Sequence, residues 1–275
     1  MARSKELFVL MDSGMGKPGS PADRKGSLVF SRKVGENCRH IAVELSEATA
    51  PSAPGQFFLV REWGVFDPLL GRPLASTASG DRRLEFLFQV TGRGTSRLAS
   101  LPPGAALELR GPCGNGFPAP VGEKLLLVAG TLGIAPFLGA VSALGEKVDV
   151  TAVLGVPGRG WEPFAEWCED KIPGIRLNSD DGSLGRRGDP VEDSLTLVGP
   201  GRELWGCGPE AMLRELGRAY EKGCEKVLVS LERRMGCGIG GCLSCSITTP
   251  SGMKRVCVDG PVFDWREVFG EPLRN

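Results

Sequence analysis

Residues 26–118 contain short stretches rich in β-branched and aromatic residues, separated by glycine, proline and polar turns. These stretches are SLVFSRKV (27–34), HIAVEL (40–45), GQFFLVRE (55–62), LEFLFQV (84–90) and AALELRG (105–111). So many strand-like segments in so short a length favour a small antiparallel β-barrel.

The rhythm changes between residues 119 and 230, where strand-like and helix-like segments alternate. The strand-like segments are 125–129, 147–155, 174–179, 202–208 and 226–230, and helical patterns begin near 136, 161 and 209. Alternation of this kind predicts a doubly wound parallel sheet. The expected fold class is therefore multidomain, β followed by α/β, with a loop-rich C-terminal segment at 231–275.

Residues 125–145 carry no charge and are long enough to cross a bilayer. Gly130, Gly133, Pro136 and Gly139 interrupt the run, however, and proline is tolerated in the first turn of a helix rather than its middle. We interpret the segment as a buried strand, a glycine turn and a helix, and predict no membrane span.

Composition narrows the function further. The chain has 275 residues, with 33 basic and 33 acidic side chains, which gives no electrostatic footprint for nucleic acid or an anionic membrane. Residues 1–25 show little pattern and no secretory signal, and are interpreted as an N-terminal extension. Nine cysteines without a signal indicate a reducing, cytoplasmic setting. His40, the one histidine, lies in a strand-like stretch and excludes a Rieske centre or a Cys2His2 zinc site.

Four of the cysteines have a spacing with chemical meaning. Cys237, Cys242 and Cys245 are arranged C-x4-C-x2-C, and Cys257 follows. This is the plant-type order for a [2Fe–2S] cluster, and the intervening glycines let a loop turn its amides toward the sulfur atoms. Zinc is the alternative, but its sites usually pair cysteines as C-x2-C twice.

Three further motifs fit phosphate binding, although each alone is weak. GRPLAS (71–76) places Arg72 at the expected end of a barrel strand, where a guanidinium can grip a phosphate. TGRGTSRL (91–98) is a glycine-rich turn with Thr95 as the expected N-cap. GTLGIAPF (130–137) follows a strand and opens a helix without the full dinucleotide fingerprint.

The ordered set of motifs resembles the iron–sulfur flavoproteins of the ferredoxin-reductase superfamily, and most closely the electron transfer subunits of NAD-dependent (class 1B) dihydroorotate dehydrogenase. The resemblance spans residues 27–268. It rests on PGQFFLVRE, DPLLGRPLAS, FQVTGRGT, LRGPCGNGF, VAGTLGIAPF, DDGSLG, WGCGPEAML and SLERRMGCGIGGCLSC…KRVCVDGPVFDWREV, in that order.

The resemblance implies an FAD-binding barrel at 26–118, an NAD-binding domain at 119–230 and a [2Fe–2S] domain at 231–275. Cys237, Cys242, Cys245 and Cys257 would hold the cluster. The FAD residues would be Arg72, Pro73, Leu74, Ala75, Leu87, Phe88, Gln89, Gly94 and Thr95, and the NAD residues Gly133, Asp181, Cys207, Gly208 and Pro209.

The implied activity is a relay of electrons from a separate FMN-containing dihydroorotate dehydrogenase subunit, through the cluster and FAD, to NAD⁺. The complex would contain two copies of each subunit. A stand-alone NAD(P)H reductase that serves a ferredoxin-type carrier is an alternative, and a structural zinc protein is another.

Two positions depart from the family pattern. Ala75 stands where the family usually has serine, with Ser76 and Thr77 next. Either a neighbouring hydroxyl substitutes, or the flavin potential differs and a partner other than dihydroorotate dehydrogenase is favoured. The glycine run before the helix is altered to AGTLG. Asp180 and Asp181 would repel a 2′-phosphate and so favour NAD, although Arg186 and Arg187 follow closely.

Overall fold

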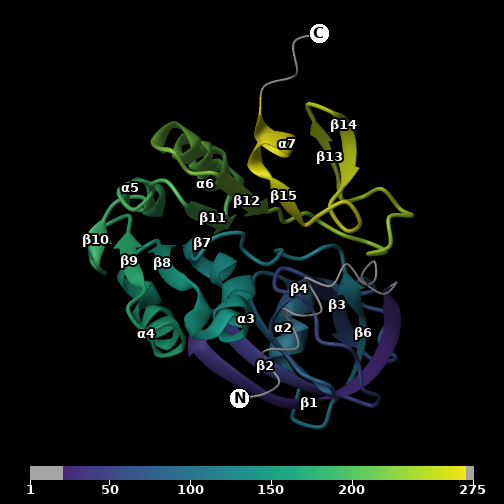
Figure 1. Ribbon diagram of the computed structural model, residues 1–275. Coiled ribbons are helices and arrows are strands. Elements are labelled where there is room, and N and C mark those ends of the chain that lie inside the picture. Colours follow the sequence, from purple (N-terminus) through teal and green to yellow (C-terminus); the bar gives the residue numbers. More distant parts are fainter. Residues whose placement is uncertain (1–20, 271–275) are drawn as a thin grey trace.

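A closed six-stranded antiparallel barrel forms the first half of the protein (Figure 1). The structure, a computed structural model, describes residues 21–270, so the predicted extension lies mostly outside the described residues. The strand order is β1-β2-β5-β4-β3-β6. The strands are β1 (Ala22–Gly35), β2 (Cys38–Leu45), β3 (Phe57–Glu62), β4 (Arg72–Ser79), β5 (Arg83–Gln89) and β6 (Ala106–Cys113).

The barrel interior is filled by apolar side chains, which alternate with more exposed ones along β6 and form a continuous buried run in the first four residues of β3. Phe58 and Phe86 are fully buried and meet edge to face, with ring centroids 5.8 Å apart. Helix α2 (Arg93–Ser100) covers one opening and contributes Leu98 to the same cluster. The predicted barrel is confirmed, and β4, which the strand pattern missed, begins at the Arg-Pro pair expected at a strand end.

The second half is built on a seven-stranded sheet with the order β10-β9-β8-β7-β11-β12-β15. All neighbours run parallel except β12 and β15. The strands are β7 (Lys124–Gly130), β8 (Asp149–Val156), β9 (Arg176–Ser179), β10 (Arg186–Arg187), β11 (Arg202–Cys207), β12 (Lys226–Ser230) and β15 (Val262–Asp264). The chain order reverses between β7 and β11, which is where open α/β sheets bind their ligands.

Helices cover both faces of this sheet, as a doubly wound fold requires. One cluster packs α3 (Ala135–Leu144) and α4 (Glu162–Lys171) on alternate residues of β7 and β8. The opposite face carries α5 (Pro190–Leu195), α6 (Glu210–Glu215) and α7 (Trp265–Phe269). Residues 125–145, the charge-free run, form β7, a 3-10 turn and α3 as predicted.

The predicted helix over 209–222 is only half α-helical. It changes after α6 to a 3-10 helix, Leu216–Lys222. Gly217 lies in this segment, where a Cβ atom would come within 2.1 Å of the Trp265 ring. A glycine weakens an α-helix, and here its missing side chain is what lets the indole pack closely.

Barrel and sheet share continuous cores. Phe117, which follows the barrel, stacks on Trp205 of β11 with centroids 4.5 Å apart and also contacts Phe137 of α3. Both Phe117 and Trp205 are fully buried. The two halves therefore pack directly against each other through buried side chains and form one unit.

The C-terminal segment leaves the sheet and returns to it. After β12 the chain forms a cysteine loop over residues 235–245 and then a hairpin of β13 (Ser246–Thr249) and β14 (Gly252–Arg255). It comes back as β15, which pairs antiparallel with β12, and ends the described chain with α7. The hairpin and α7 lie together at the top of Figure 1.

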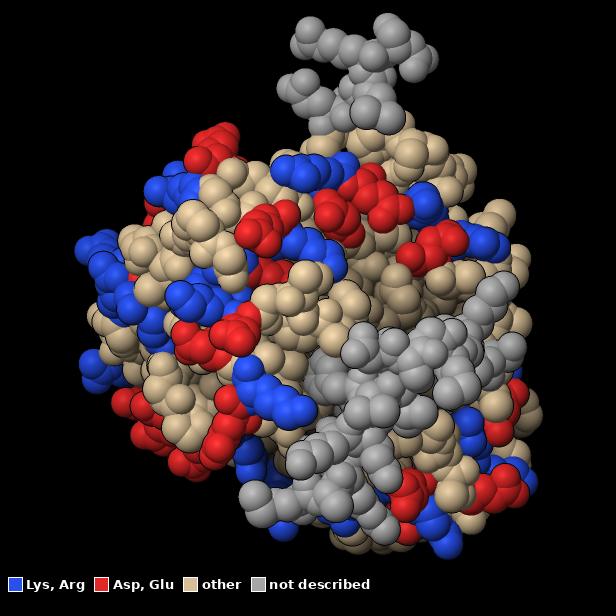
Figure 2. All heavy atoms as spheres, in the orientation of Figure 1, with Lys and Arg blue, Asp and Glu red and all other residues tan. Residues whose placement is uncertain are grey.

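The surface carries no large field of one sign on the face shown in Figure 2, where acidic and basic side chains are interspersed outside the area beneath the grey residues. Over residues 21–270 no helix combines the length and apolar character needed to cross a membrane.

Candidate functional site

A cavity of about 710 Å³ lies where the barrel, the carboxyl edge of the parallel sheet and the start of the cysteine loop meet. Its volume is in the range of cofactor pockets. Twelve residues singled out from the sequence line it: Arg72, Pro73, Leu74, Ala75, Leu87, Phe88, Gln89, Thr95, Gly133, Cys207, Gly208 and Pro209. The structure thus brings twelve of the fourteen expected FAD and NAD residues into one cavity, and Gly94 and Asp181 do not line it.

The barrel wall is formed by β4, β5 and the start of α2. The Arg72 guanidinium donates to the Leu70 carbonyl and lies directly over Gly94, where a Cβ atom would fall 1.5 Å from Arg72 Nη1. Only glycine fits there without displacing the guanidinium. Gly94 itself does not line the large cavity but a smaller pocket beside it, which it shares with Arg72.

Thr95 differs from its predicted role. The N-cap of α2 is Gly92, and Thr95 is the third residue of the helix. Its hydroxyl Oγ1 accepts hydrogen bonds from the amides of Thr91 (3.0 Å) and Gly92 (3.1 Å). A hydroxyl at this position orders the turn by reaching back, because Gly92 has no side chain with which to cap the helix.

The sheet wall is formed where β7 and β11 end. At Gly133 a Cβ atom would lie 2.0 Å from the Cys207 carbonyl oxygen, so glycine is needed for the two strand ends to approach. Burial raises the pKa of the Cys207 thiol, which therefore stays protonated and uncharged beside the cavity. Pro209 then starts α6.

A third wall was not assigned a role from the sequence. Residues 230–235, SLERRM, line the cavity as the chain leaves β12. Glu210, also on the cavity, accepts from Arg214 and Arg233 at 2.7 Å each, which ties this segment to α6. The carboxyl ends of neighbouring parallel strands meet at one edge, so knowledge of the strand order would have indicated this wall.

Asp181, predicted near the adenosine ribose, does not line the cavity. It lies in the turn after β9, where its carboxylate accepts from the Ser183 amide (2.9 Å) and hydroxyl (2.6 Å), and these bonds lower the pKa of the carboxyl. Asp180 beside it is exposed. Of the two arginines that follow these acids in the sequence, Arg186 is ion-paired with Asp193 and Arg187 is exposed.

Neither hydroxyl next to Ala75 takes the place of the family serine. Ala75 lines the cavity, but Ser76 and Thr77 do not. Ser76 Oγ is buried and hydrogen-bonded to Ser52 Oγ at 2.7 Å. The Thr77 hydroxyl is buried without a partner. The cavity therefore presents a methyl group at position 75.

His40 is the ordinary strand histidine that the sequence predicted. Its Nε2 lies 2.9 Å from Glu85 Oε2 on the neighbouring strand β5, and its ring packs against Phe30 and Trp167. It is not on the cavity.

Three of the four spaced cysteines lie in the cysteine loop, and Cys257 joins them from beyond the β13–β14 hairpin. Cys237 Sγ accepts from the amides of Ile239 (3.5 Å) and Cys242 (3.4 Å), and Cys257 Sγ accepts from the Gly240 amide (3.2 Å). The thiols of Cys237 and Cys242 interact, as do those of Cys245 and Cys257. Gly238 and Gly240 have φ of 71° and 78°, which favours glycine.

This arrangement fits a binuclear cluster. Thiols grouped in two pairs, with amides directed at the sulfur atoms, suit a [2Fe–2S] cluster, whose four cysteines are shared between two irons.

The C-terminal segment matches a known domain model. Residues 232–269 match the iron-sulfur cluster binding domain of dihydroorotate dehydrogenase B. The match covers residues 232–235 of the third cavity wall, all four cysteines and β15.

Relatives and solved structures agree with this result. The chain is 33% identical over 218 residues (76% of this chain, 83% of the relative) to the dihydroorotate dehydrogenase B (NAD(+)) electron transfer subunit of Clostridium acetobutylicum. It is 36% identical over 255 residues (88% and 96%) to the subunit of the same name from a Geobacillus species.

Among solved structures, a NADH-dependent reduced ferredoxin-NADP oxidoreductase studied for electron bifurcation superposes with a TM-score of 0.76 at 25% identity, covering 92% of this chain and 91% of that one. A ferredoxin NADP⁺ reductase from Neisseria gonorrhoeae with bound FAD and NADP gives 0.61 at 16% identity, covering 73% and 92%.

Barrel, parallel sheet and cysteine loop together define an oxidoreductase of the ferredoxin-reductase fold with an added iron–sulfur domain. Within that class, the chain belongs to the family of dihydroorotate dehydrogenase B (NAD(+)) electron transfer subunits. The resemblance drawn from the sequence motifs is confirmed.

Proposed function

We propose that this chain carries electrons from a dihydroorotate dehydrogenase catalytic subunit, through a [2Fe–2S] cluster and FAD, to NAD⁺. The observation that carries the proposal is that one short segment connects the cavity, where FAD is proposed to bind, to the loop that is proposed to hold the cluster. Residues 230–235 line the cavity, and Cys237 begins the cluster loop two residues after Met235. The short connection favours electron transfer between the cavity and the loop.

In this proposal the barrel side of the cavity holds FAD. Arg72 pairs with the pyrophosphate, because a guanidinium binds phosphate bidentately. Gly94 leaves the guanidinium its space, and Thr95 fixes the adjoining turn. The ring system lies along the remaining barrel residues Pro73, Leu74, Ala75, Leu87, Phe88 and Gln89.

The sheet side then receives the nicotinamide of NAD. Gly133 and Gly208 provide a backbone surface that a planar ring can approach, and Cys207 and Pro209 border it. A neutral Cys207 thiol adds no charge where a hydride must pass. Bound flavin supplies the chemistry that joins the carriers, because it exchanges two electrons with NAD and one with a cluster. Asp181 is proposed to face the adenosine ribose.

Cys237, Cys242, Cys245 and Cys257 are the proposed cluster ligands. The proposed division of labour is FAD on residues 26–118, NAD on 119–230 and the cluster on 231–275, with β15 returning to the sheet of the second part. None of the nine cysteines forms a disulfide in the part of the chain that the structure describes, and we propose a reducing, cytoplasmic setting.

The catalytic partner is proposed to dock on the cluster loop. Four apolar side chains on or beside the loop are exposed by 44% to 70%: Ile239, Leu243, Met253 and Val258. Exposed apolar residues grouped around a redox centre are typical of a protein interface. We propose an FMN-containing dihydroorotate dehydrogenase subunit as the partner, in a complex of two copies of each.

Cys242→Ser tests the relay. A serine hydroxyl is a much poorer iron ligand than a thiolate, so this variant should lose or greatly weaken the cluster. We expect it to keep its FAD and its NADH–dye activity within about twofold, yet to lose nearly all coupling of dihydroorotate oxidation to NAD⁺ reduction when mixed with the partner. Iron content and the visible spectrum report the loss of the cluster.

Cys224→Ser is the matched control, since Cys224 is a buried thiol of the sheet domain outside the loop. It should retain both the cluster and the coupling. A folded, cluster-free Cys242→Ser protein that still couples normally would refute the relay order. Rapid reduction of ferredoxin by the isolated chain, without any partner, would instead support the stand-alone reductase.

A further inference from the structure

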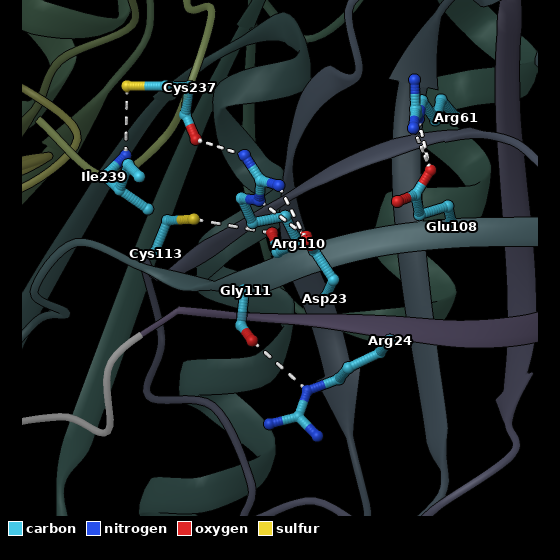
Figure 3. A network of polar contacts seen from close by, with 9 residues as sticks. All are labelled: Asp23, Arg24, Arg61, Glu108, Arg110, Gly111, Cys113, Cys237 and Ile239. Atoms are coloured by element: carbon cyan, nitrogen blue, oxygen red, sulfur yellow. Dashed lines mark hydrogen bonds and ion pairs between the residues drawn. The ribbon is translucent and has the colours of Figure 1, made fainter. Parts of the chain in front are cut away.

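One arginine of the barrel is hydrogen-bonded to the cluster loop. Arg110 lies on β6, and its Nη1 atom donates to the carbonyl oxygen of Cys237 at 3.3 Å (Figure 3). Cys237 is the first of the four proposed ligands, so this guanidinium is a fixed positive charge attached to the backbone of a ligand residue.

A carboxylate on the neighbouring strand holds the guanidinium in place. Asp23 of β1 pairs directly opposite Arg110 in the sheet register. Arg110 Nε donates to Asp23 Oδ1 at 2.6 Å and Nη2 donates to Oδ2 at 2.8 Å, a bidentate pair. The third nitrogen is left to face the loop. The pairing lowers the pKa of Asp23, so the carboxylate is charged at neutral pH.

The loop packs tightly on the barrel beside this pair. A Cβ atom at Gly238 would lie 2.9 Å from Leu59 Cδ1 and 3.1 Å from Cys113 Sγ. Leu59 and Cys113 are both buried. Arg110 therefore lies at the margin of an apolar contact between β3, β6 and the loop. Its side chain is 36% exposed and that of Asp23 is 52% exposed, so solvent screens the charge of Asp23 more than that of Arg110.

Of the two charges in the pair, the positive one is nearer to the loop. Arg110 contacts Cys237 directly, whereas Asp23 reaches the loop only through Arg110. A cluster gains one negative charge when it accepts an electron. The nearer positive charge favours the reduced form, and the more distant negative charge partly opposes it.

We propose that Arg110 is a positioning residue that raises the reduction potential of the cluster, and that the negative charge of Asp23 limits the size of this increase. This inference rests on the proposed ligand role of Cys237 and goes beyond the relay itself. Arg110 makes the cluster a better acceptor for electrons arriving from the partner subunit, and it anchors the ligand loop to the barrel.

The test is a comparison of two single variants in the full-length protein, Arg110→Gln and Asp23→Asn. Cluster midpoint potentials are measured by redox titration followed by electron paramagnetic resonance. Arg110→Gln should shift the one-electron equilibrium about tenfold toward the oxidised cluster, which is ~59 mV more negative. Asp23→Asn removes the opposing charge and should shift the potential in the positive direction, by a smaller amount.

The opposite signs separate this role from a merely structural one. If the ion pair only holds the loop in place, both variants release the same clamp and both shifts have the same sign, which overturns the proposal. An unchanged potential in Arg110→Gln overturns it as well. Should Arg110→Gln fail to load iron, the sign of the Asp23→Asn shift decides alone.

Arg61→Gln is the control. Arg61 sits on β3 and is ion-paired with Glu108 of β6, close to the Arg110 pair in Figure 3, but no hydrogen bond joins it to the loop. Its shift should be less than a third of that in Arg110→Gln, and an equal shift would show that overall charge, not contact with Cys237, sets the potential. If the cysteines are not the ligands, Cys242→Ser keeps its iron, so the failure of that premise is distinguishable.

Discussion

Single residues at the cavity have little freedom to vary. Arg72 occupies the space that any side chain at position 94 would need, so the arginine and the glycine operate as a pair. Glycine-rich turns are often read as flexible, but here the missing side chain serves a fixed neighbour.

Arg72→Ala should weaken FAD binding by about 10- to 100-fold, since a hydrogen bond to a charged group contributes ~1.5–3 kcal/mol. Flavin fluorescence released on dilution measures the loss. Arg93→Ala is the control, because Arg93 is 78% exposed, pairs with Asp67 and does not line the cavity. Wild-type FAD affinity in Arg72→Ala would rule out the assignment.

At the scale of secondary-structure elements, one carboxylate joins a helix to two strands. Asp193 of α5 is buried and accepts two hydrogen bonds, at 2.7 and 2.8 Å, from Arg176 of β9, and it also pairs with Arg186 of β10. The Arg176 hydrogen bonds, followed by the charges of both arginines, lower the pKa of the Asp193 carboxyl. The edge of the sheet is thereby fastened to the helix beneath it.

Asp193→Asn should reduce the free energy of unfolding by about 2 kcal/mol at neutral pH. Because the folded-state pKa is depressed, the stabilisation is complete above the unfolded-state value near ~3.9 and is lost as the pH falls through the folded-state pKa. Urea unfolding of both proteins should give a constant difference from pH 8 to 5 that shrinks below about pH 4. A difference that already fades between pH 8 and 6 would contradict this.

Residues at this edge of the sheet are also expected to determine whether the protein prefers NADH or NADPH. Asp180 and Asp181 follow β9 as exposed acids, while Arg186 is held by Asp193. NADH should therefore reduce the flavin at least about tenfold faster than NADPH, because a 2′-phosphate would meet the acids. Stopped-flow flavin reduction with each nucleotide measures this, and Asp181→Asn should narrow the ratio. Equal rates in the wild type would place the ribose elsewhere.

Elements with a strong hydrophobic period were predictable from the sequence, and short ones were not. Five of the six barrel strands and five of the seven sheet strands stand where their patterns indicated. The two-residue β10, six-residue α5 and three-residue β15 are too short for any period to show. For the site, motif residues on β4, β5, β7 and β11 were found. The wall at 230–235 was missed because its role depends on strand order, which no local pattern encodes.

At the scale of the whole molecule, the two halves and the cluster segment share their cores. One cluster of buried residues joins Phe57 and Leu59 of the barrel, the sheet, and Cys245 and Cys257 of the loop. The cavity lies where all three parts meet, so its shape depends on each of them. A variant that loosens the cluster segment is therefore expected to disturb nucleotide binding through packing, which is why folded protein must be verified in Cys242→Ser.

The return of β15 to the sheet has a consequence for how the protein is made. The edge of β12 is covered by residues 262–264, which are synthesised only after the whole cysteine loop. The nucleotide-binding sheet therefore cannot be completed on the ribosome before every cluster ligand has been translated. A protein truncated within the loop would have an uncovered strand edge at β12, which is prone to aggregation. It would not be a working flavoprotein that merely lacks iron.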